Sequence, residues 1–279
     1  MNTYEFTALV WLGATVAGFL GALTGLGGGV VIVPLLALGF GVDIRYAIGA
    51  SLVSVIATSS GAAAAYVKEG FTNVRIGMFL EIATTLGALL GAMLATIVST
   101  SAIAIIFGFV LLYSAILSRK SKPQAQQADQ RPDKLGTLLR MSGTYPTANG
   151  EVSYNVHRVP LGFGLMLGAG TLSGLLGIGS GAVKVLALDL AMRIPFKVST
   201  TTSNFMIGVT AAASAGVYLS RGYIDPGLAM PVMIGVLTGS MLGARLLVRA
   251  KTKVLRLVFA GVIAALGVEM IFNGFTGRI

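Results

Sequence analysis

Lys184 is the residue of this chain whose type and position most clearly imply chemistry. It lies in an apolar stretch, three residues after the glycine run Gly177–Gly181, whose sequence is GIGSG. A lysine inside a membrane segment is costly and marks a functional site by default. Glycines let a ligand approach the main chain, and a helix that starts after them directs unpaired N–H groups back at them. Lys184 and the glycine run therefore predict an anion-binding site. A lysine that snorkels to the interface or pairs with an acid such as Asp189 is the alternative.

The glycine run has a copy in the first half of the chain. Gly25–Gly29, with the sequence GLGGG, precedes Gly177–Gly181 by 152 residues, and the flanking segments align at the same offset without a gap. The copies are unequal, because Lys184 stands where the first half has Ile32. Two halves that are each interrupted at one point within membrane-like sequence are typical of transporters with a site at the repeat interface. Glycines that only allow helices to pack tightly are the alternative.

Polar side chains follow both glycine runs. In the second half, hydroxyl groups and one amide open the next segment, where they could donate hydrogen bonds to sulfonate or carboxylate oxygens or bond to their own helix. Asn204 is the strongest candidate among them, because its amide is the hardest to leave unpaired. The predicted substrate-binding residues are Gly27, Gly28, Gly29 and Ser51 in the first half, and Gly179, Ser180, Gly181, Lys184, Thr202, Ser203 and Asn204 in the second.

Glu81 is the candidate for carrying a coupling proton. It lies several residues inside the apolar segment that starts near Arg75, or roughly 9 Å deep at a rise of about 1.5 Å per residue. Carboxylates at membrane depth are common members of proton relays in transporters. An internal ion pair between Glu81 and a cytoplasmic arginine is the alternative.

The composition is that of a membrane protein, and it excludes several other classes. Hydrophobic residues make up 55% of the chain and charged residues 11%, with a mean hydropathy of +0.86, whereas soluble proteins carry about 25% charged residues. There is no cysteine, and the single histidine, His157, lies in a hydrophilic loop. No phosphate-binding loop of the G-x-x-x-x-G-K-[ST] type is present. We therefore expect no enzyme activity, no metal and no cofactor.

Ten apolar segments are expected to be helical, five in each half. They are Phe6–Leu23, Val30–Phe40, Tyr46–Val67, Ile76–Val98 and Ala102–Leu117, followed by Leu161–Leu176, Ala182–Ala191, Val198–Leu219, Gly227–Val248 and Val254–Phe272. As a helix, Val30–Phe40 would cover roughly 16 Å of a bilayer core of about 30 Å, so it cannot cross the membrane. A re-entrant hairpin that turns at the glycine run fits its length. One broken span over Phe6–Phe40 is the alternative.

The positive charges decide between these topologies. The net charge is +10, and in so apolar a chain lysines and arginines set the membrane orientation more often than they bind nucleic acid. Ten segments put sixteen of them on the cytoplasmic side and three outside, whereas eight spans leave eleven inside and eight outside. An odd number of segments per half inverts the second repeat. We therefore predict an all-α polytopic protein of the cytoplasmic membrane, with two inverted transmembrane repeats at residues 1–117 and 159–279 and both termini extracytoplasmic.

Residues 118–158 are the long hydrophilic stretch of the chain and are expected to form a cytoplasmic connector. The first part, from Ser121 to Arg131, has the composition of a flexible linker. The second part alternates around Asn149-Gly150 and predicts a small β-hairpin, with Val152, Tyr154 and Val156 on one face. The hairpin either packs on the cytoplasmic face or simply tethers the two halves, and we favour the tether.

The chain resembles the TauE/SafE family of sulfite and sulfonate transporters, also called the TSUP family, over nearly its whole length. The resemblance rests on the two glycine runs and on the segments Ala47–Ser54 (AIGASLVS) and Thr202–Met206 (TSNFM). Two positions depart from the family pattern, because Ser180 replaces a usual glycine and Leu186 an expected proline. The resemblance implies transport, without ATP, of a small sulfur-containing anion such as sulfite, thiosulfate or an organosulfonate.

Three functions are weighed on this basis. The leading hypothesis is a secondary transporter that works by alternating access of two inverted halves, and its coupling to protons is left open. A passive anion channel with the same site, and a non-transporting membrane scaffold whose cytoplasmic hairpin binds a partner, are the alternatives. The expected partners are a small anion and the lipid bilayer, and no nucleic acid. The sequence specifies neither the direction of transport nor the oligomeric state.

Overall fold

The protein is a bundle of helices in two halves, joined by a small connector. The computed structural model describes residues 2–24, 29–68, 70–119, 133–147, 150–247 and 252–277. The first half comprises α1 (Thr3–Thr24), α2 (Gly29–Pro34), the π-helical turn η1 (Leu35–Gly39), α3 (Ile44–Lys68), α4 (Val74–Ile97) and α5 (Thr100–Arg119). The second half comprises α7 (Val159–Leu176), α8 (Gly181–Leu186), η2 (Ala187–Ala191), α9 (Phe196–Ser220), α10 (Pro226–Leu247) and α11 (Thr252–Thr276).

The same order of elements occurs twice, at the offset found in the sequence. Helices α2 and α8 begin 152 residues apart and end 152 residues apart, as do η1 and η2, and α3 and α9. Within the described residues, each of the ten predicted apolar segments lies in a helix except for one or two residues at its ends, and the two short segments are a helix continued by a π-turn. The helical fold class and the short elements after both glycine runs are therefore confirmed.

The two short elements keep the same shape although their sequences differ. Pro34 ends α2, whereas the second half has Leu186 at the corresponding position. A π-turn follows in both cases, η1 after α2 and η2 after α8, and in the second the N–H of Met192 bonds to the carbonyl of Ala187, five residues earlier. The second turn therefore forms without the proline. Single π-turns within helices are rare and often lie at functional sites.

Close backbone contacts join α4 to α7 and α1 to α10. An added Cβ would lie 2.1 Å from the Leu167 carbonyl oxygen at Gly87 and 2.0 Å from that of Thr171 at Gly91. At Gly239 it would lie 1.9 Å from the Thr15 carbonyl oxygen. Only glycine fits at such distances, so these glycines serve helix packing, as small residues do in membrane bundles.

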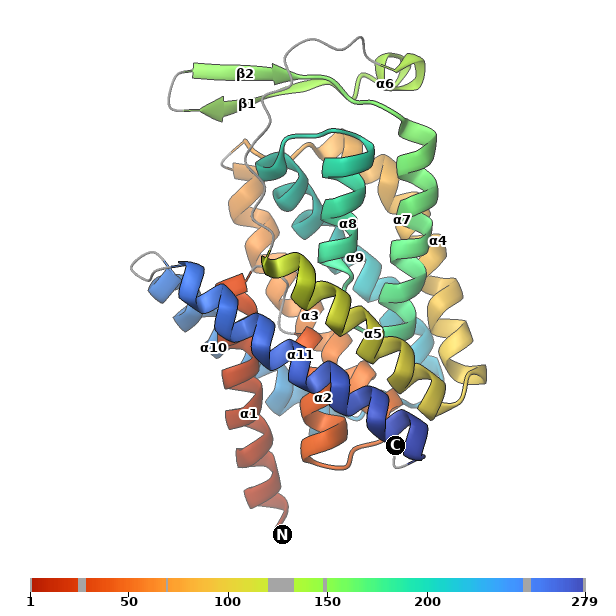
Figure 1. Ribbon diagram of the computed structural model, residues 1–279, viewed down its shortest axis with the longest axis vertical. Helices are drawn as coiled ribbons and strands as arrows, with labels where there is room; N and C mark the ends of the chain where they lie inside the picture. Colours follow the sequence, from red (N-terminus) through yellow and green to blue (C-terminus); the bar gives the residue numbers. More distant parts are fainter. Residues whose placement is uncertain are drawn as a thin grey trace.

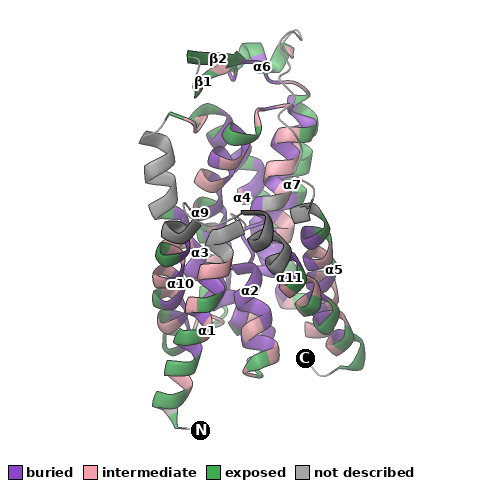
Figure 2. Ribbon diagram, turned by 60° about the vertical axis from the view of Figure 1, so that its left-hand side comes forward, coloured by how far each residue is buried: buried purple, intermediate pink, exposed green. Residues whose placement is uncertain are grey.

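The outer surface of the bundle is apolar, as expected for contact with lipid. Figure 2 shows α2 buried in purple and green exposed residues along the outer helices. The exposed large apolar side chains include Leu86, Leu90, Phe109, Ile116, Leu161, Leu165, Val268 and Phe272. Among the described residues, three helices are long and apolar enough to cross a membrane, at Val74–Ile97, Val159–Leu176 and Pro226–Gly243, and further apolar helices are shorter.

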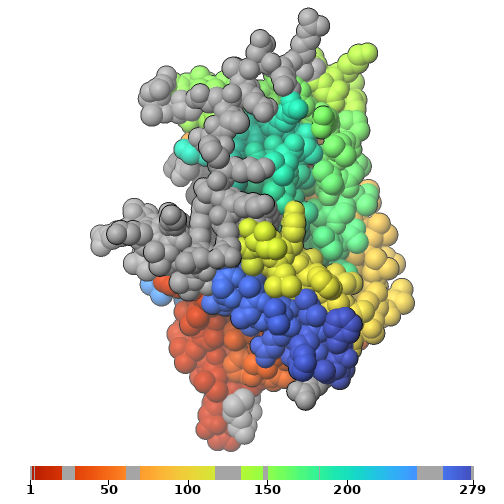
Figure 3. Space-filling view, viewed as in Figure 1, coloured from red at the N-terminus to blue at the C-terminus, as the bar shows by residue number. Residues whose placement is uncertain are grey.

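Helices α5 and α11 lie side by side across one face of the molecule (Figure 3). They meet at glycines, because an added Cβ on Gly108 would lie 2.6 Å from the carbonyl oxygen of Gly267. These two helices occupy corresponding places in the two halves. Their contact therefore joins one half to the other.

The connector contains α6 (Lys134–Leu138) and an antiparallel hairpin of β1 (Gly143–Thr147) and β2 (Gly150–Tyr154). The predicted hairpin is confirmed, although its tip residue Asn149 lies outside the described residues. The hairpin lies across one end of the bundle (Figure 1). Tyr154 and Val156 are buried there, whereas Val152 is 40% exposed and does not share their environment. The connector thus packs on the bundle, and the favoured role of a simple tether is wrong.

Candidate functional site

The start of α2 and the second glycine run come together inside the bundle. Ser51 of α3 donates a hydrogen bond of 2.8 Å to the carbonyl oxygen of Gly177, which ends α7. An added Cβ on Gly29, the first residue of α2, would lie 3.2 Å from that same oxygen. The start of α2 therefore touches the end of α7, and a residue predicted for the site, Ser51, forms the link. Gly27 and Gly28 lie outside the described residues.

The second glycine run is a left-handed turn. Gly177 and Gly179 have φ angles of 67° and 69°, and Ser180 has a φ of 45°. Left-handed backbone is uncommon for a residue with a side chain and tends to occur at functional sites. Ser180 precedes α8 without capping it through its side chain. Its hydroxyl group is buried and has no hydrogen-bond partner in the described part of the chain. The turn therefore holds a hydroxyl group that is free to bind a ligand.

Lys184 lies one turn into α8 and is completely buried. Its ammonium group donates a hydrogen bond of 2.5 Å to the hydroxyl of Thr210 in α9. That hydroxyl lies 2.7 Å from Glu81 Oε1 of α4. Three helices thus bring a lysine and a glutamate to the same threonine. The acid near Lys184 is therefore Glu81, which the sequence had not paired with it.

Glu81 is 8% exposed and lies among hydroxyl groups. Its Oε1 accepts hydrogen bonds from Thr210 and, at 3.3 Å, from Thr85. Its Oε2 is buried and has no partner among the described residues. The alternative of an ion pair with a cytoplasmic arginine is not what the structure has, since Arg75 of the same helix donates instead to the carbonyl of Arg140.

Thr210 is the residue of this network that the sequence did not single out. It is buried and follows Ser203 by seven residues, or two turns, so both lie on the inward face of α9. Ser203 donates a hydrogen bond of 3.2 Å to the carbonyl of Gly181. The helical spacing from a predicted site residue is the signal that could have identified Thr210.

The other predicted residues of α9 have different surroundings. The hydroxyl of Thr202 accepts a hydrogen bond of 3.0 Å from the backbone N–H of Asn73. Asn204 is half-buried and takes no part in the hydrogen bonds around Lys184. Its role as a ligand stays a prediction.

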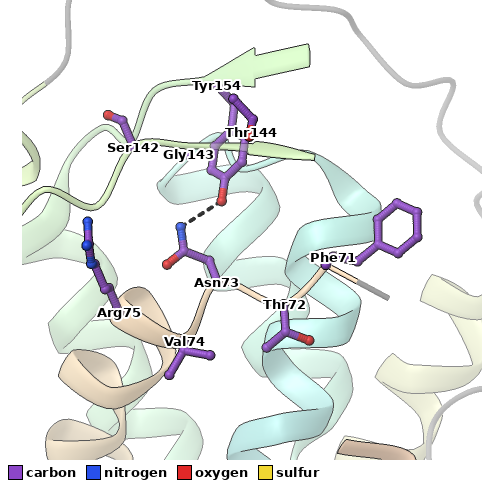
Figure 4. A pocket seen from close by; sticks show the side chains of 10 residues that line it. Phe71, Thr72, Asn73, Val74, Arg75, Ser142, Gly143, Thr144 and Tyr154 are labelled. Carbon is purple, nitrogen blue, oxygen red and sulfur yellow. Dashed lines mark hydrogen bonds between the residues drawn. The ribbon is translucent and has the colours of Figure 1, made fainter. Parts of the chain in front are cut away.

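A cavity of about 310 Å³ lies at the end of the bundle, between residues 70–75 and the hairpin (Figure 4). Asn73 holds the two together, because its side-chain amide donates to the Tyr154 hydroxyl at 2.7 Å and to the Met141 carbonyl at 2.9 Å. Its Oδ1 also caps α4 by accepting from the N–H of Ile76. Burial raises the pKa of Tyr154 above its usual value. Asn73 therefore attaches the connector to the first half.

Within the described ranges, no group of three or more histidine, aspartate or glutamate side chains could hold a metal ion. The chemistry of the central site is therefore carried by one ammonium group, one carboxyl group and several hydroxyl groups. Such a set suits an oxyanion, which accepts hydrogen bonds, and a proton, which a carboxylate accepts.

Comparison with known proteins gives one consistent set of matches. The family described as "Sulfite exporter TauE/SafE" matches residues 10–270. The "Probable membrane transporter protein YunE" of Bacillus subtilis is 29% identical over 97% of this chain and 98% of its own length. A "Probable membrane transporter protein" of Xylella fastidiosa is 25% identical over 94% of each chain. YdhB of Bacillus subtilis, with the same description, is 28% identical over 85% of this chain and 87% of its own. No solved structure matches.

Proposed function

Because the chain belongs to the TauE/SafE family of sulfite exporters, we propose that it is a secondary transporter of a small sulfur-containing anion such as sulfite, thiosulfate or an organosulfonate. Proteins of this family are membrane transporters and not enzymes, and this chain is a membrane protein of that kind. The substrate class, the mechanism and the coupling are the parts that we add.

The observation that carries the proposal is the position of Lys184. Its charge is completely buried, one turn after a left-handed glycine turn that holds the unpartnered hydroxyl of Ser180. A buried cation beside a buried donor can replace part of the hydration shell of an anion through charge-assisted hydrogen bonds. The substrate is therefore held beside Gly177–Gly181, on the side of the second half and not midway between the two halves.

Alternating access of two inverted halves is the proposed mechanism. The repeated order of elements supports it, and so do the directions of corresponding helices. Helix α1 starts at the end of the molecule that carries the N-terminus, at the bottom of Figure 1, whereas α7 starts at the opposite end beside the hairpin. Inverted repeats allow one group of helices to rock against another around a fixed site.

The proposed orientation places the connector in the cytoplasm of a cell whose cytoplasmic membrane holds the bundle. The positive charges of residues 118–158 support this, because cytoplasmic loops carry an excess of lysine and arginine. Arg75, Arg140 and Arg158 belong to the connector end of the bundle.

Uptake of labelled sulfite into proteoliposomes tests the proposal. Wild-type protein is expected to take up sulfite above the level of protein-free liposomes and to show saturation. Lys184→Ala should abolish uptake. Lys197→Ala is the matched control, because Lys197 lies over the ring of Phe71 and outside the central site. The absence of uptake of sulfite, thiosulfate and taurine under either direction of gradient would overturn the proposal.

The same proteoliposomes separate the alternatives. A carrier loaded with unlabelled substrate accelerates the entry of labelled substrate, whereas a passive channel does not. If the protein is a scaffold, the full-length chain gives only background anion flux, and deletion of residues 143–155 abolishes its function. Counterflow in the wild type, retained after Glu81→Gln, supports a carrier whose proton step resides at Glu81.

A further inference from the structure

The hydroxyl group of Thr210 has two acceptors beside it, and when Glu81 is a carboxylate its single proton can serve only one of them. Thr210 Oγ1 lies 2.5 Å from Lys184 Nζ, 2.7 Å from Glu81 Oε1 and 2.9 Å from the carbonyl oxygen of Met206. A hydroxyl donates one proton and accepts through two lone pairs. Lys184 can only donate and Met206 can only accept, so the assignment depends on Glu81.

The protonation state of Glu81 decides which way the Thr210 hydroxyl points. When Glu81 is a carboxylate, Thr210 donates its proton to Glu81 and the carbonyl of Met206 keeps only its helical hydrogen bond. When Glu81 is a carboxyl group, it can donate to Thr210, and Thr210 then donates to Met206. Lys184 donates to Thr210 in both states. The network therefore accepts a proton at Glu81 without losing its hold on Lys184.

The charges around Glu81 are few. Lys184 of α8 is the charge that acts on it from a neighbouring helix. Helix α7, which packs along α4, contains no ionisable residue. In α9, Tyr218 donates its hydroxyl to the carbonyl of Gly174, and Lys197 lies over the ring of Phe71 at the end of the helix. The hydroxyl of Thr85 lies 3.3 Å from the carboxyl group, and that of Thr84 lies 3.4 Å from the hydroxyl of Thr210. Glu81 and Lys184 are thus counter-ions of each other.

We propose that Lys184, Thr210 and Glu81 form a counter-ion switch, in which Lys184 is neutralised either by Glu81 or by the transported anion. The inference rests on the proposed function and specifies its coupling. An uncompensated charge in the interior is strongly unfavourable. A monoanion that binds beside Lys184 therefore requires Glu81 to lose its charge, and one proton enters with each anion.

The proton balance of this switch is simple. The proton comes from water on the side to which the site is open and bonds to the Glu81 carboxylate. Lys184 keeps its own protons throughout. When the anion leaves, the carboxyl group returns its proton to water and again neutralises Lys184. The occupied and empty sites have the same net charge, so transport of a monoanion is electroneutral.

The test measures uptake against membrane potential and proton gradient separately. Proteoliposomes with wild-type protein receive labelled sulfite under conditions acidic enough that the hydrogensulfite monoanion predominates. Valinomycin and potassium set the potential to zero, negative or positive, with and without an inward proton gradient. The proton gradient is expected to drive accumulation, and the potential is expected to leave it unchanged. Protein-free liposomes and Lys184→Ala measure leakage of the uncharged acid.

Each outcome has a distinct meaning. Uptake that follows the potential, or that ignores the proton gradient, overturns the counter-ion switch and leaves the proposed function standing. No uptake at all overturns the proposed function itself. Accumulation driven by the proton gradient alone supports both.

Thr210 variants test whether this residue positions the switch. Thr210→Val removes the hydroxyl at nearly constant volume and is expected to abolish accumulation by the proton gradient, while Thr210→Ser restores it. Thr58→Val is the matched control, because Thr58 stands at the corresponding position of α3 and, in the described part of the chain, bonds to its own helix at the carbonyls of Ser54 and Val55. If Thr210→Val is folded and remains fully coupled, Thr210 has no part in coupling. If it does not fold, full coupling in Thr210→Ser together with coupling lost in Glu81→Gln supports the switch, and coupling retained in Glu81→Gln overturns it.

Discussion

Helices α2 and α8 occupy corresponding places in the two halves but differ in what they carry. Every residue of α2 (Gly29–Pro34) is buried, and all its side chains are apolar. Helix α8 (Gly181–Leu186) has the same length and the same π-turn after it, yet it carries Lys184 at the place of Ile32. The backbone is therefore repeated, whereas the charge is not.

The difference shows that the scaffold and the chemistry of this protein are separable. The opposite charge is equally one-sided, because Glu81 corresponds to Met233 in the second half. The lysine and the glutamate come from different halves, and Thr210 joins them. A pair of charges replaces a pair of apolar residues at one of two equivalent places, and the proposed site lies at that place.

The largest effect is expected when Lys184 and Glu81 are replaced by the residue types at the corresponding positions of the other half, which are isoleucine and methionine. Lys184→Ile alone leaves Glu81 buried without its counter-ion, and breaking a buried pair in this way costs about 3–5 kcal/mol. Lys184→Ile combined with Glu81→Met removes both charges and is expected to recover most of the lost stability but no transport. Thermal unfolding in detergent and sulfite uptake check this. A double variant that transports like the wild type would contradict the functional role of the pair.

A smaller effect is expected at the left-handed glycine turn that begins at Gly177. Among the described residues, only the second half has such a turn. Gly177→Ala places a side chain at a φ of 67° and 2.7 Å from a methyl group of Ile48. Backbone strain and overpacking each cost on the order of 1–3 kcal/mol, so the unfolding temperature should decrease clearly. Gly168→Ala is the control, because nothing lies within 4 Å of its added Cβ. Equal stabilities of the two variants would show that the turn is relaxed.

The next comparison concerns the two serines at corresponding positions, Ser51 and Ser203. Ser51 bonds across the halves to the carbonyl of Gly177 at 2.8 Å, whereas Ser203 bonds within its own half to Gly181 at 3.2 Å. Loss of a buried hydrogen bond typically costs about 0.5–1.5 kcal/mol. Ser51→Ala is expected to destabilise the protein more than Ser203→Ala. The reverse order in thermal unfolding would contradict the geometry.

The smallest effect is expected at the connector, which has no counterpart in either half. Tyr154→Phe removes the acceptor for Asn73 and should speed hydrogen exchange in β1 and β2 without changing sulfite uptake. Because burial raises the pKa of Tyr154 above its usual 10.0, the folded connector binds the phenolic proton more tightly than the unfolded one. Its stability is therefore constant below the ordinary pKa and decreases as pH rises above it. Exchange rates that show no such dependence in the wild type would contradict the burial.

The sequence predicted the elements better than it predicted the contacts between them. Apolar length and the constant offset identified the ten helical segments, the two short ones among them, because these depend on local composition. Lys184 and Glu81 stood out because charges are rare in such segments. Thr210 did not, since a threonine within a helix is ordinary until the neighbouring helices are in place. The packing of the connector depends on Asn73, a loop residue whose partners lie far along the chain.

The glycine contacts of α4 with α7 and of α1 with α10 have a mechanical consequence. Where two backbones touch at Gly87, Gly91 and Gly239, no side chains can rearrange to let one helix slide or roll against the other. Each of these two helix pairs is therefore expected to move as one rigid unit, and each unit contains one helix from each half. If the protein moves as proposed, the motion occurs where these units meet α3 and α9, and the Gly177 turn and the proposed counter-ion pair lie there.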